Sequence, residues 1–255
     1  MNVILIGAGR GNRLMPLTAS QPKSFTNVAG KKILEWAMDA FRENSLDQFV
    51  FIGGYLKNVV EQSYPNLKMV ENSDWPNNNI LFSLLSAREH LVDGFYSTYT
   101  DTLFRGTAVR KLKESPHDIV LVMDTRWRER YKYRSQHPEK DGEKMIAIGD
   151  AVTRVSRDIA PDDASGEFTG VMKMSAAGAA RFLDFYDVLS SSVDSEETFE
   201  DGRPFRMAYV IHQLDRMILA GIEVHCVPVP GDYHEIDPLE DYGLAAQDWA
   251  RFAKD

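Results

Sequence analysis

The stretch IGAGRGNRLMPLTASQPKSF, residues 6–25, has three glycines among its first six residues. An apolar run from Val3 to Ile6 leads directly into this turn, and two cations follow at Arg13 and Lys23. Small residues let backbone N–H groups approach a phosphate, and a turn that enters a helix directs further N–H groups towards it. A guanidinium can fork onto phosphate oxygens, whereas an ammonium acts as a point charge. The stretch therefore predicts a phosphate-binding turn after a first β-strand; the alternative is a structural turn with exposed cations.

Two well-known phosphate motifs do not account for this turn. The dinucleotide fingerprint G-x-G-x-x-G fits at Gly7 and Gly9, but Asn12 occupies the place of the third glycine. A P-loop requires Gly, four residues and then Gly-Lys-Ser or Gly-Lys-Thr, and the sequence has no such run. The turn is therefore of another class, in which an arginine and a later Pro-Lys pair supply the positive charge.

The composition limits the classes of function. The chain has 255 residues, of which 44% are hydrophobic, and its formal net charge of -9 argues against general binding to nucleic acid or to an anionic membrane. Cys226 is the only cysteine, so an intrachain disulfide and a multi-thiolate metal site are excluded. No apolar run approaches the ~20 residues that span a bilayer. We expect a cytoplasmic protein that meets any anionic ligand with a local cluster of cations.

Short apolar runs alternate with helical patterns over the first half of the chain. The runs are not cleanly alternating, which is typical of strands that are buried on both faces. The predicted strands are residues 2–6, 49–53, 68–70, 95–99 and 118–123, and the predicted helices are 33–42, 56–63, 80–91 and 108–114. This order predicts an α/β fold with a doubly wound, mostly parallel sheet of the Rossmann-like type and helices on both of its faces.

The pattern changes after Asp124. Two short alternating runs predict an antiparallel hairpin with Gly149 and Asp150 at its turn. We expect one domain over residues 1–255, in which residues 125–170 form an inserted lid. The remaining predicted elements are the hairpin strands 145–148 and 152–155, strands 168–174 and 222–229, helices 177–189 and 205–219, a last helix from about Leu239, and a loose surface segment over 190–203.

The opening stretch resembles that of the nucleotidyltransferases that join a nucleoside triphosphate to a phosphorylated small molecule. Their motif is Ala-Gly-x-Gly-x-Arg-Leu-x-Pro-Leu-Thr followed by Pro-Lys. Ten positions match it: Ala8, Gly9, Gly11, Arg13, Leu14, Pro16, Leu17, Thr18, Pro22 and Lys23. The resemblance implies that Arg13 and Lys23 are catalytic, with Lys23 close to the α-phosphate as negative charge grows there. It also implies a nucleotide-binding turn made of Gly7, Ala8, Gly9, Arg10 and Gly11.

Carboxylates at strand ends form the second part of the predicted site, because a parallel sheet binds ligands outside the carboxyl ends of its strands. Asp101 ends the run FYSTYTD, and Asp237 lies in YHEIDPLEDY. The second run resembles the family's Trp-x-Glu-Ile-Asp-Thr-x-Glu-Asp-Leu, whose Asp before Thr holds a metal. The resemblance implies that Asp101 and Asp237 bind Mg²⁺. The alternatives are a turn-forming role for Asp101 and an N-cap of the last helix for Asp237.

The run WPNNNILFSLLSAREHL, residues 75–91, resembles the loop and helix with which this family reads the base. In this interpretation Asn78 or Asn79 caps the helix, and the other amide hydrogen-bonds a pyrimidine edge together with Ser83. An Asn-Asn-Ile-x-Ser-Leu run is typical of the cytidylyltransferases for phosphocholine and for phosphonates such as 2-aminoethylphosphonate. This sequence has one extra residue before Ser83. The resemblance implies CTP as the nucleotide.

Two further stretches, VMDTRWRERYKYRSQHPEKDGEKM (residues 122–145) and GEFTGVMKMS (residues 166–175), resemble the same branch. The resemblance implies that the lid of residues 125–170 is the acceptor-binding insertion. In this interpretation three cations clamp the phosphate of the acceptor, two carboxylates suit an amine on it, and a tyrosine stacks on it. These residues are Arg130, Arg134, Lys144, Glu167, Glu235 and Tyr233. Solvated surface charge is the alternative for most of residues 126–134, and His234 is interpreted as an exposed neighbour of the site.

Together these features predict a Mg²⁺-dependent cytidylyltransferase that transfers CMP from CTP to a small phosphonate or phosphorylated alcohol and releases pyrophosphate. A sugar-1-phosphate nucleotidyltransferase and a catalytically silent nucleotide sensor are the alternatives. A phosphonate is favoured over phosphocholine, because Tyr233 stands where the branch has Trp and cations crowd residues 126–144. We expect no nucleic-acid or membrane partner, and a homodimer is left open.

Overall fold

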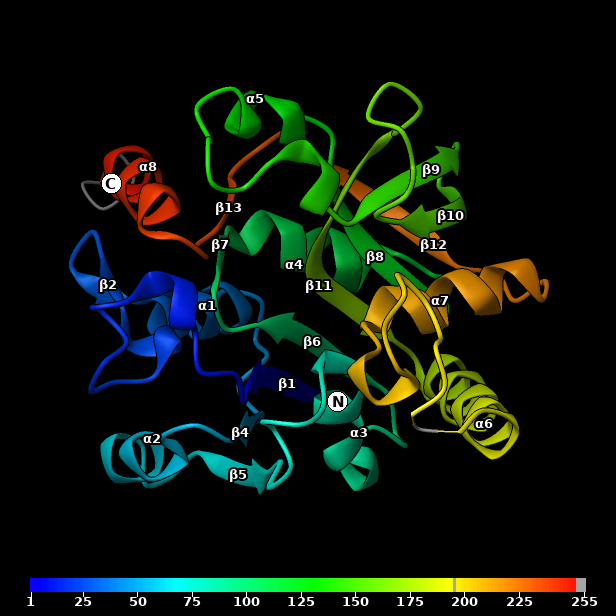
Figure 1. Cartoon of the computed structure of the whole chain (residues 1–255), viewed down its shortest axis with the longest axis horizontal. Helices are drawn as coiled ribbons and strands as arrows, with labels where there is room; N and C mark the ends of the chain where they lie inside the picture. Colours follow the sequence, from blue (N-terminus) through cyan, green and yellow to red (C-terminus); the bar gives the residue numbers. More distant parts are fainter. Residues whose placement is uncertain (195, 251–255) are drawn as a thin grey trace.

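The computed structural model describes residues 1–194 and 196–250. Its centre is a nine-stranded sheet in the order β5-β4-β1-β6-β11-β8-β12-β10-β9 (Figure 1). The nine strands predicted from the sequence are the nine strands of this sheet. They are β1 (Asn2–Gly7), β4 (Phe49–Gly53), β5 (Lys68–Glu71), β6 (Phe95–Tyr99), β8 (Ile119–Asp124), β9 (Lys144–Ile148), β10 (Ala151–Ser156), β11 (Gly166–Met174) and β12 (His225–Val229).

The sheet is mixed rather than mostly parallel. β1 runs parallel to β4 and β6, β4 to β5, and β8 to β12. β11, however, is antiparallel to both β6 and β8, and the predicted hairpin of β9 and β10 is antiparallel and joins the end of the same sheet. The hairpin of β9 and β10 reverses the direction of the chain before it reaches β11, and β11 therefore runs opposite to β6 and β8.

Helices cover both faces of the sheet, as predicted. They are α1 (Ile33–Arg42), α2 (Lys57–Ser63), α3 (Ile80–Ser86), α4 (Gly106–Glu114), α5 (Trp127–Tyr131), α6 (Ala176–Ser192), α7 (Val210–Leu219) and α8 (Leu239–Trp249). Along β1, Ile4 and Ile6 share one core with α3, α6 and α7, whereas Val3 and Leu5 share another with α1, α2 and α4. Successive side chains of a strand point to opposite faces, so an apolar run of this kind feeds two cores at once.

Two small sheets complete the fold, and they were not predicted. β2 (Asn27–Val28) pairs with β3 (Lys31–Lys32), and β7 (Thr102–Phe104) pairs with β13 (Tyr233–Glu235). Strands of two or three residues are too short to show a periodic pattern in the sequence. The pairing of β7 with β13 ties the C-terminal part of the chain to the end of β6.

The turn after β1 requires glycine at one position. Gly11 has a φ of 67°, and a Cβ atom there would lie 3.0 Å from side-chain atoms of Lys23. Thr18 holds this turn, because its hydroxyl donates a hydrogen bond to the Gly11 carbonyl at 2.9 Å. At Gly9, in contrast, nothing lies within 4 Å of the place where a Cβ would stand. Gly11 is therefore needed for the backbone path that brings Lys23 beside the turn.

Two expectations concern the periphery of the molecule. The segment 190–203, predicted to be loose, begins inside α6, and its residue 195 lies outside the described residues. A β-bridge joins Thr198 to Pro204 within the same part of the chain.

No helix in the described ranges is long and apolar enough to cross a membrane.

Gly11→Ala is expected to destabilise the protein by roughly 1–2 kcal/mol, because an L-residue pays about that much in the left-handed region. Thermal unfolding should show a drop of a few degrees in Tm. Gly9→Ala is the matched control, since its Cβ would enter open space. Equal Tm values for the two variants would contradict the role given to Gly11.

Candidate active site

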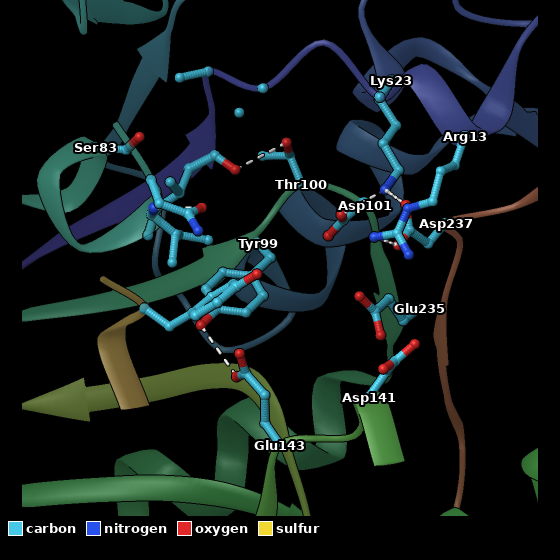
Figure 2. A pocket seen from close by; sticks show the side chains of 18 of the residues that line it. Arg13, Lys23, Ser83, Tyr99, Thr100, Asp101, Asp141, Glu143, Glu235 and Asp237 are labelled. Atoms are coloured by element: carbon cyan, nitrogen blue, oxygen red, sulfur yellow. Dashed lines mark hydrogen bonds and ion pairs between the residues drawn. The ribbon is translucent and has the colours of Figure 1, made fainter. Parts of the chain in front are cut away.

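A cavity of about 560 Å³ lies at the carboxyl ends of β1 and β6 (Figure 2). Its lining includes the glycine turn, the start of α3, the residues that follow β6, the start of β11, and Tyr233, Glu235 and Asp237 in and after β13. Open α/β sheets bind their ligands at this edge. The fold therefore places a cavity where the sequence predicts a phosphate-binding turn.

Most of the residues predicted to bind a nucleotide or to act in catalysis line this cavity. Those that do are Gly7, Ala8, Gly9, Gly11, Arg13, Lys23, Asn78, Asn79 and Ser83. Arg10 does not line it: this residue is exposed, and its guanidinium lies over the ring of Tyr55 at 5.4 Å from the centroid. The predicted metal ligands Asp101 and Asp237 are also in the lining.

Lys23 lies between these two carboxylates (Figure 2). Its Nζ is 2.8 Å from Asp101 Oδ2 and 3.1 Å from Asp237 Oδ1, and Arg13 forms a second ion pair with Asp237. Burial alone would lower the pKa of Lys23, but the two carboxylates outweigh it and raise that pKa. Burial would likewise raise the pKa of Asp237, and the charges of Lys23 and Arg13 lower it instead. Two cations and two carboxylates thus balance at one edge of the cavity.

Backbone pairing explains why the two carboxylates meet. β7 begins directly after Asp101, and β13 ends two residues before Asp237. The two strands are antiparallel with Glu235 opposite Thr102, and the N–H of Ile236 donates to the carbonyl of Asp101 at 2.9 Å. This register sets Asp101 and Asp237 side by side although they are far apart in the sequence.

The carboxylate pair fits a hard divalent cation. Asp101 Oδ1 is buried and has no hydrogen-bond partner among the described residues, although Oδ2 accepts from Lys23. Mg²⁺ prefers oxygen ligands and takes few of them from protein. The N-cap alternative for Asp237 is wrong, because Pro238 occupies the cap position of α8 and the Asp237 carboxylate turns towards Lys23.

The amides at the start of α3 have separate roles. Asn79 is the N-cap, since its side chain accepts a hydrogen bond from the N–H of Ile80 at 2.9 Å. Asn78 is tied to the buried Asn72, which donates to Asn78 Oδ1 at 2.8 Å and to Ser83 Oγ at 2.9 Å. The side chains of Asn78 and Ser83 therefore form one connected set of donors and acceptors on a wall of the cavity.

Two of the cations predicted to clamp the acceptor phosphate are used inside the protein. Arg130 is paired with Asp124 and Glu167, and Arg134 Nε lies 2.8 Å from Asp241 Oδ1. Neither arginine lines the cavity. The alternative, that Arg130 and Arg134 are exposed surface charges, is also wrong, because their side chains are only 9% and 1% exposed.

Lys144, the third predicted clamp, is fully buried and does not line the cavity. Its ammonium donates to the carbonyls of Gly142 at 3.1 Å, Glu139 at 3.3 Å and Lys140 at 3.4 Å. Burial lowers its pKa. Lys144 therefore stabilises the loop before β9 and does not face the cavity.

His234, predicted to be exposed, is instead buried, with Nε2 3.2 Å from Asp248 Oδ2.

The other predicted acceptor-binding residues, Glu167, Tyr233 and Glu235, do line the cavity. Glu167 is already engaged, because it pairs with Arg130 and accepts a hydrogen bond from the Tyr131 hydroxyl at 2.6 Å. Glu235 is less occupied: the nearest cationic group is Nε2 of His137, 3.7 Å from its carboxylate. Glu235 is therefore the more available acid of the two.

Several cavity residues were given no role from the sequence. They are Tyr99, Thr100, His137, Asp141, Glu143, Arg157, Arg203 and Tyr209. His137 and Glu143 stand in the matched run of residues 122–145, which is the signal that could have drawn attention to them. Arg157 follows β10 directly and carries no recognisable motif, so only the fold reveals that it reaches the cavity.

Two buried acids at the cavity have raised pKa values. Burial raises the pKa of Glu143 to about 7; Arg157 acts against this rise and Glu235 adds to it. Burial also raises the pKa of Glu235 to about 7; His137 opposes the rise, and Asp101 and Asp237 add to it. This side of the cavity therefore changes its charge close to neutral pH.

Glu143→Gln is expected to stabilise the protein at pH 8 relative to the wild type. The folded-state pKa of about 7 lies above the unfolded value. At pH 8 the buried carboxylate of Glu143 is therefore charged and lowers the stability of the folded protein. At low pH the carboxyl is neutral in both states, and this cost is absent. The gain in Tm should shrink as the pH falls through 7 and disappear near the unfolded pKa of about 4.3. Calorimetry between pH 4 and pH 8 measures this, and a gain that is independent of pH would contradict it.

Known proteins share this architecture. A family model described as the MobA-like NTP transferase domain matches residues 3–159. A CTP:phosphoglutamine cytidylyltransferase of Campylobacter jejuni is 25% identical over 252 residues, which cover 94% of this chain and 97% of that protein. A choline-phosphate cytidylyltransferase of Streptococcus pneumoniae is 23% identical over 247 residues, or 95% of each chain.

A solved structure of CTP:phosphocholine cytidylyltransferase from Streptococcus pneumoniae has the same fold. It superposes with a TM-score of 0.73 at 22% sequence identity and covers 97% of this chain and 98% of that chain. The family model spans more than half of the present sequence and contains the glycine turn, Lys23 and Asp101. The chain therefore belongs to the MobA-like NTP transferase family.

Proposed function

We propose that this protein is a cytidylyltransferase that transfers CMP from CTP to a small phosphorylated or phosphonic acid acceptor and releases pyrophosphate. The observation that carries the proposal is the meeting of Lys23, Arg13, Asp101 and Asp237 beside the glycine turn, in one cavity with further polar groups. A relative that aligns with almost the whole chain is named as a CTP:phosphoglutamine cytidylyltransferase, which supports the choice of nucleotide.

The base of CTP is assigned to the wall made by Asn78 and Ser83. A pyrimidine edge presents both donors and acceptors, and an amide with a neighbouring hydroxyl can supply the matching set. Asn72 keeps these two side chains in place through hydrogen bonds at 2.8 and 2.9 Å. The triphosphate is assigned to the backbone of the glycine turn and to the guanidinium of Arg13.

Asp101 and Asp237 are assigned as the ligands of Mg²⁺. Bound there, the ion would neutralise part of the phosphate charge. Lys23 holds both carboxylates when no nucleotide is bound. In the complex we assign its ammonium to the α-phosphate, where negative charge grows as the fifth oxygen approaches phosphorus.

The reaction is an in-line displacement. An oxygen of the acceptor phosphate or phosphonate forms a new bond to the α-phosphorus, the bond to the β-phosphate oxygen breaks, and pyrophosphate leaves. No strong general base is needed, because a phosphate monoester with a second pKa near ~6 is largely dianionic at neutral pH. The work of the protein is therefore alignment and charge neutralisation.

The acceptor is assigned to the part of the cavity formed by β13 and residues 125–170, which we retain as the acceptor-binding insertion of a single domain. Asp141, Glu143 and Glu235 supply carboxylates there. These groups suit an ammonium that donates hydrogen bonds, whereas the quaternary ammonium of phosphocholine donates none. An aminophosphonate or an aminoalkyl phosphate is therefore proposed ahead of phosphocholine, on the basis of these carboxylates and not of the buried cations Arg130, Arg134 and Lys144.

Pyrophosphate release tests the proposal. CTP, UTP, ATP and GTP are each supplied with Mg²⁺ and one of three acceptors: 2-aminoethylphosphonate, phosphocholine or a sugar 1-phosphate. We expect release with CTP and the aminophosphonate. Faster release with UTP and a sugar 1-phosphate would replace the proposal with the sugar-nucleotide alternative. Binding of CTP without any release would identify a silent nucleotide sensor.

Lys23→Ala is expected to lower the turnover number by roughly 10²-fold or more, while CTP affinity changes far less, because the ammonium matters most in the transition state. Lys31→Ala is the control, since Lys31 is half-exposed and its ammonium pairs with Asp39 at the surface, outside the cavity. Steady-state kinetics and CTP titration separate the two effects. A normal turnover number in Lys23→Ala would refute the catalytic assignment.

A further inference from the structure

The acceptor side of the cavity carries charges of both signs. Asp141, Glu143 and Glu235 provide carboxylates on the side away from the glycine turn (Figure 2). Arg157 and Arg203 provide guanidinium groups in the same lining. An acceptor that carries only an amine besides its phosphate or phosphonate would use the carboxylates and leave the arginines without a ligand partner.

Arg157 is only partly satisfied by protein groups. Its NH2 lies 3.5 Å from Glu143 Oε1, at the upper limit of a hydrogen bond. Its Nε is buried and has no hydrogen-bond partner within the described part of the chain. The guanidinium carbon of Arg157 lies over the ring of Tyr209, 3.9 Å from its centroid, and that of Arg203 lies over the same ring at 5.4 Å. Arg157 thus lies in the cavity lining with its Nε donor unpaired and with only a long contact to Glu143.

The carboxylates are also incompletely paired. Glu235 has His137 at 3.7 Å, and Glu143 has Arg157 at 3.5 Å and the Tyr99 hydroxyl at 3.4 Å. These are long contacts compared with the 2.8 Å pair of Lys23 and Asp101. A primary ammonium has three N–H donors and can satisfy several such oxygens at once.

We propose that the acceptor has a zwitterionic tail, so that it is a phosphorylated or phosphonic amino acid. Asp141, Glu143 and Glu235 bind its ammonium group. Arg157, with help from Arg203, binds its carboxylate, which a planar guanidinium can hold through two parallel hydrogen bonds. This inference rests on the proposed function, because it names the acceptor class of that same site.

Two matched pairs of acceptors isolate the carboxylate. O-phosphoserine is phosphoethanolamine with an added carboxylate, and 2-amino-3-phosphonopropionate is 2-aminoethylphosphonate with the same addition. With the wild type, CTP and Mg²⁺, we expect kcat/KM to be about 10- to 100-fold higher for the carboxylated member of at least one pair, as a charge-assisted hydrogen bond implies.

Arg157→Gln is expected to bring that ratio close to one, because it removes the charge that distinguishes the two members. Arg203→Gln, at an exposed position that places no demand on folding, should lower the ratio by a smaller factor. Arg154→Gln is the control: Arg154 pairs with Asp215 at the surface, outside the cavity. It should keep the wild-type ratio.

The outcomes separate the inference from the function on which it rests. Pyrophosphate release in which the carboxylated members are no better than their partners overturns the zwitterionic tail and leaves the cytidylyltransferase proposal standing. A wild-type preference that survives in both Arg157→Gln and Arg203→Gln overturns the assigned residues. The proposed function itself is contradicted if pyrophosphate is released with none of these four acceptors and is not released with phosphocholine or a sugar 1-phosphate either.

Discussion

The contact of one ammonium with two carboxylates is the interaction on which the site depends. Lys23 lies within 3.1 Å of Asp101 and Asp237, two acids that would repel each other without a cation between them. Each of the three residues comes from a different part of the fold. The left-handed Gly11 directs the chain to Lys23, the end of β6 presents Asp101, and the pairing of β7 with β13 brings Asp237 alongside. In our account the ammonium keeps the metal ligands together until nucleotide and cation arrive.

The part of the cavity that we assign to the acceptor is organised differently, by buried charges that do not line the cavity. Arg134 is paired with Asp241, whose other oxygen accepts from the N–H of Asp237 and lies 3.1 Å from His137 Nδ1. Lys144 holds the carbonyls of the loop before β9. Such groups cost desolvation energy and are tolerated only when they are paired. Arg134 also donates to the carbonyl of Glu235, and Lys144 fixes the loop that carries Asp141 and Glu143, so these buried cations hold the segments that present carboxylates to the cavity.

The sequence predicted the strands of the main sheet and most of the residues that line the cavity beside the glycine turn, because both depend on short-range patterns. The glycine turn, Arg13 and Lys23 lie within one continuous stretch, and the cap of α3 follows from local amide chemistry. The cations on the opposite side of the cavity were not predicted correctly, because charge patterns do not show which way a side chain points. Arg130 reads as a solvated or ligand-binding cation in the sequence and is instead buried between Asp124 and Glu167. Arg157 reaches the cavity only through the docking of the β9–β10 hairpin on the sheet.

A crystal structure with Mn²⁺ and a non-hydrolysable CTP analogue tests the central claim most directly. Mn²⁺ scatters anomalously and can stand in for Mg²⁺ on oxygen ligands. Our account predicts an anomalous peak bound by the carboxylates of Asp101 and Asp237, with the ammonium of Lys23 moved from them to the α-phosphate. A complex in which Lys23 keeps both carboxylates and the metal binds elsewhere would contradict it.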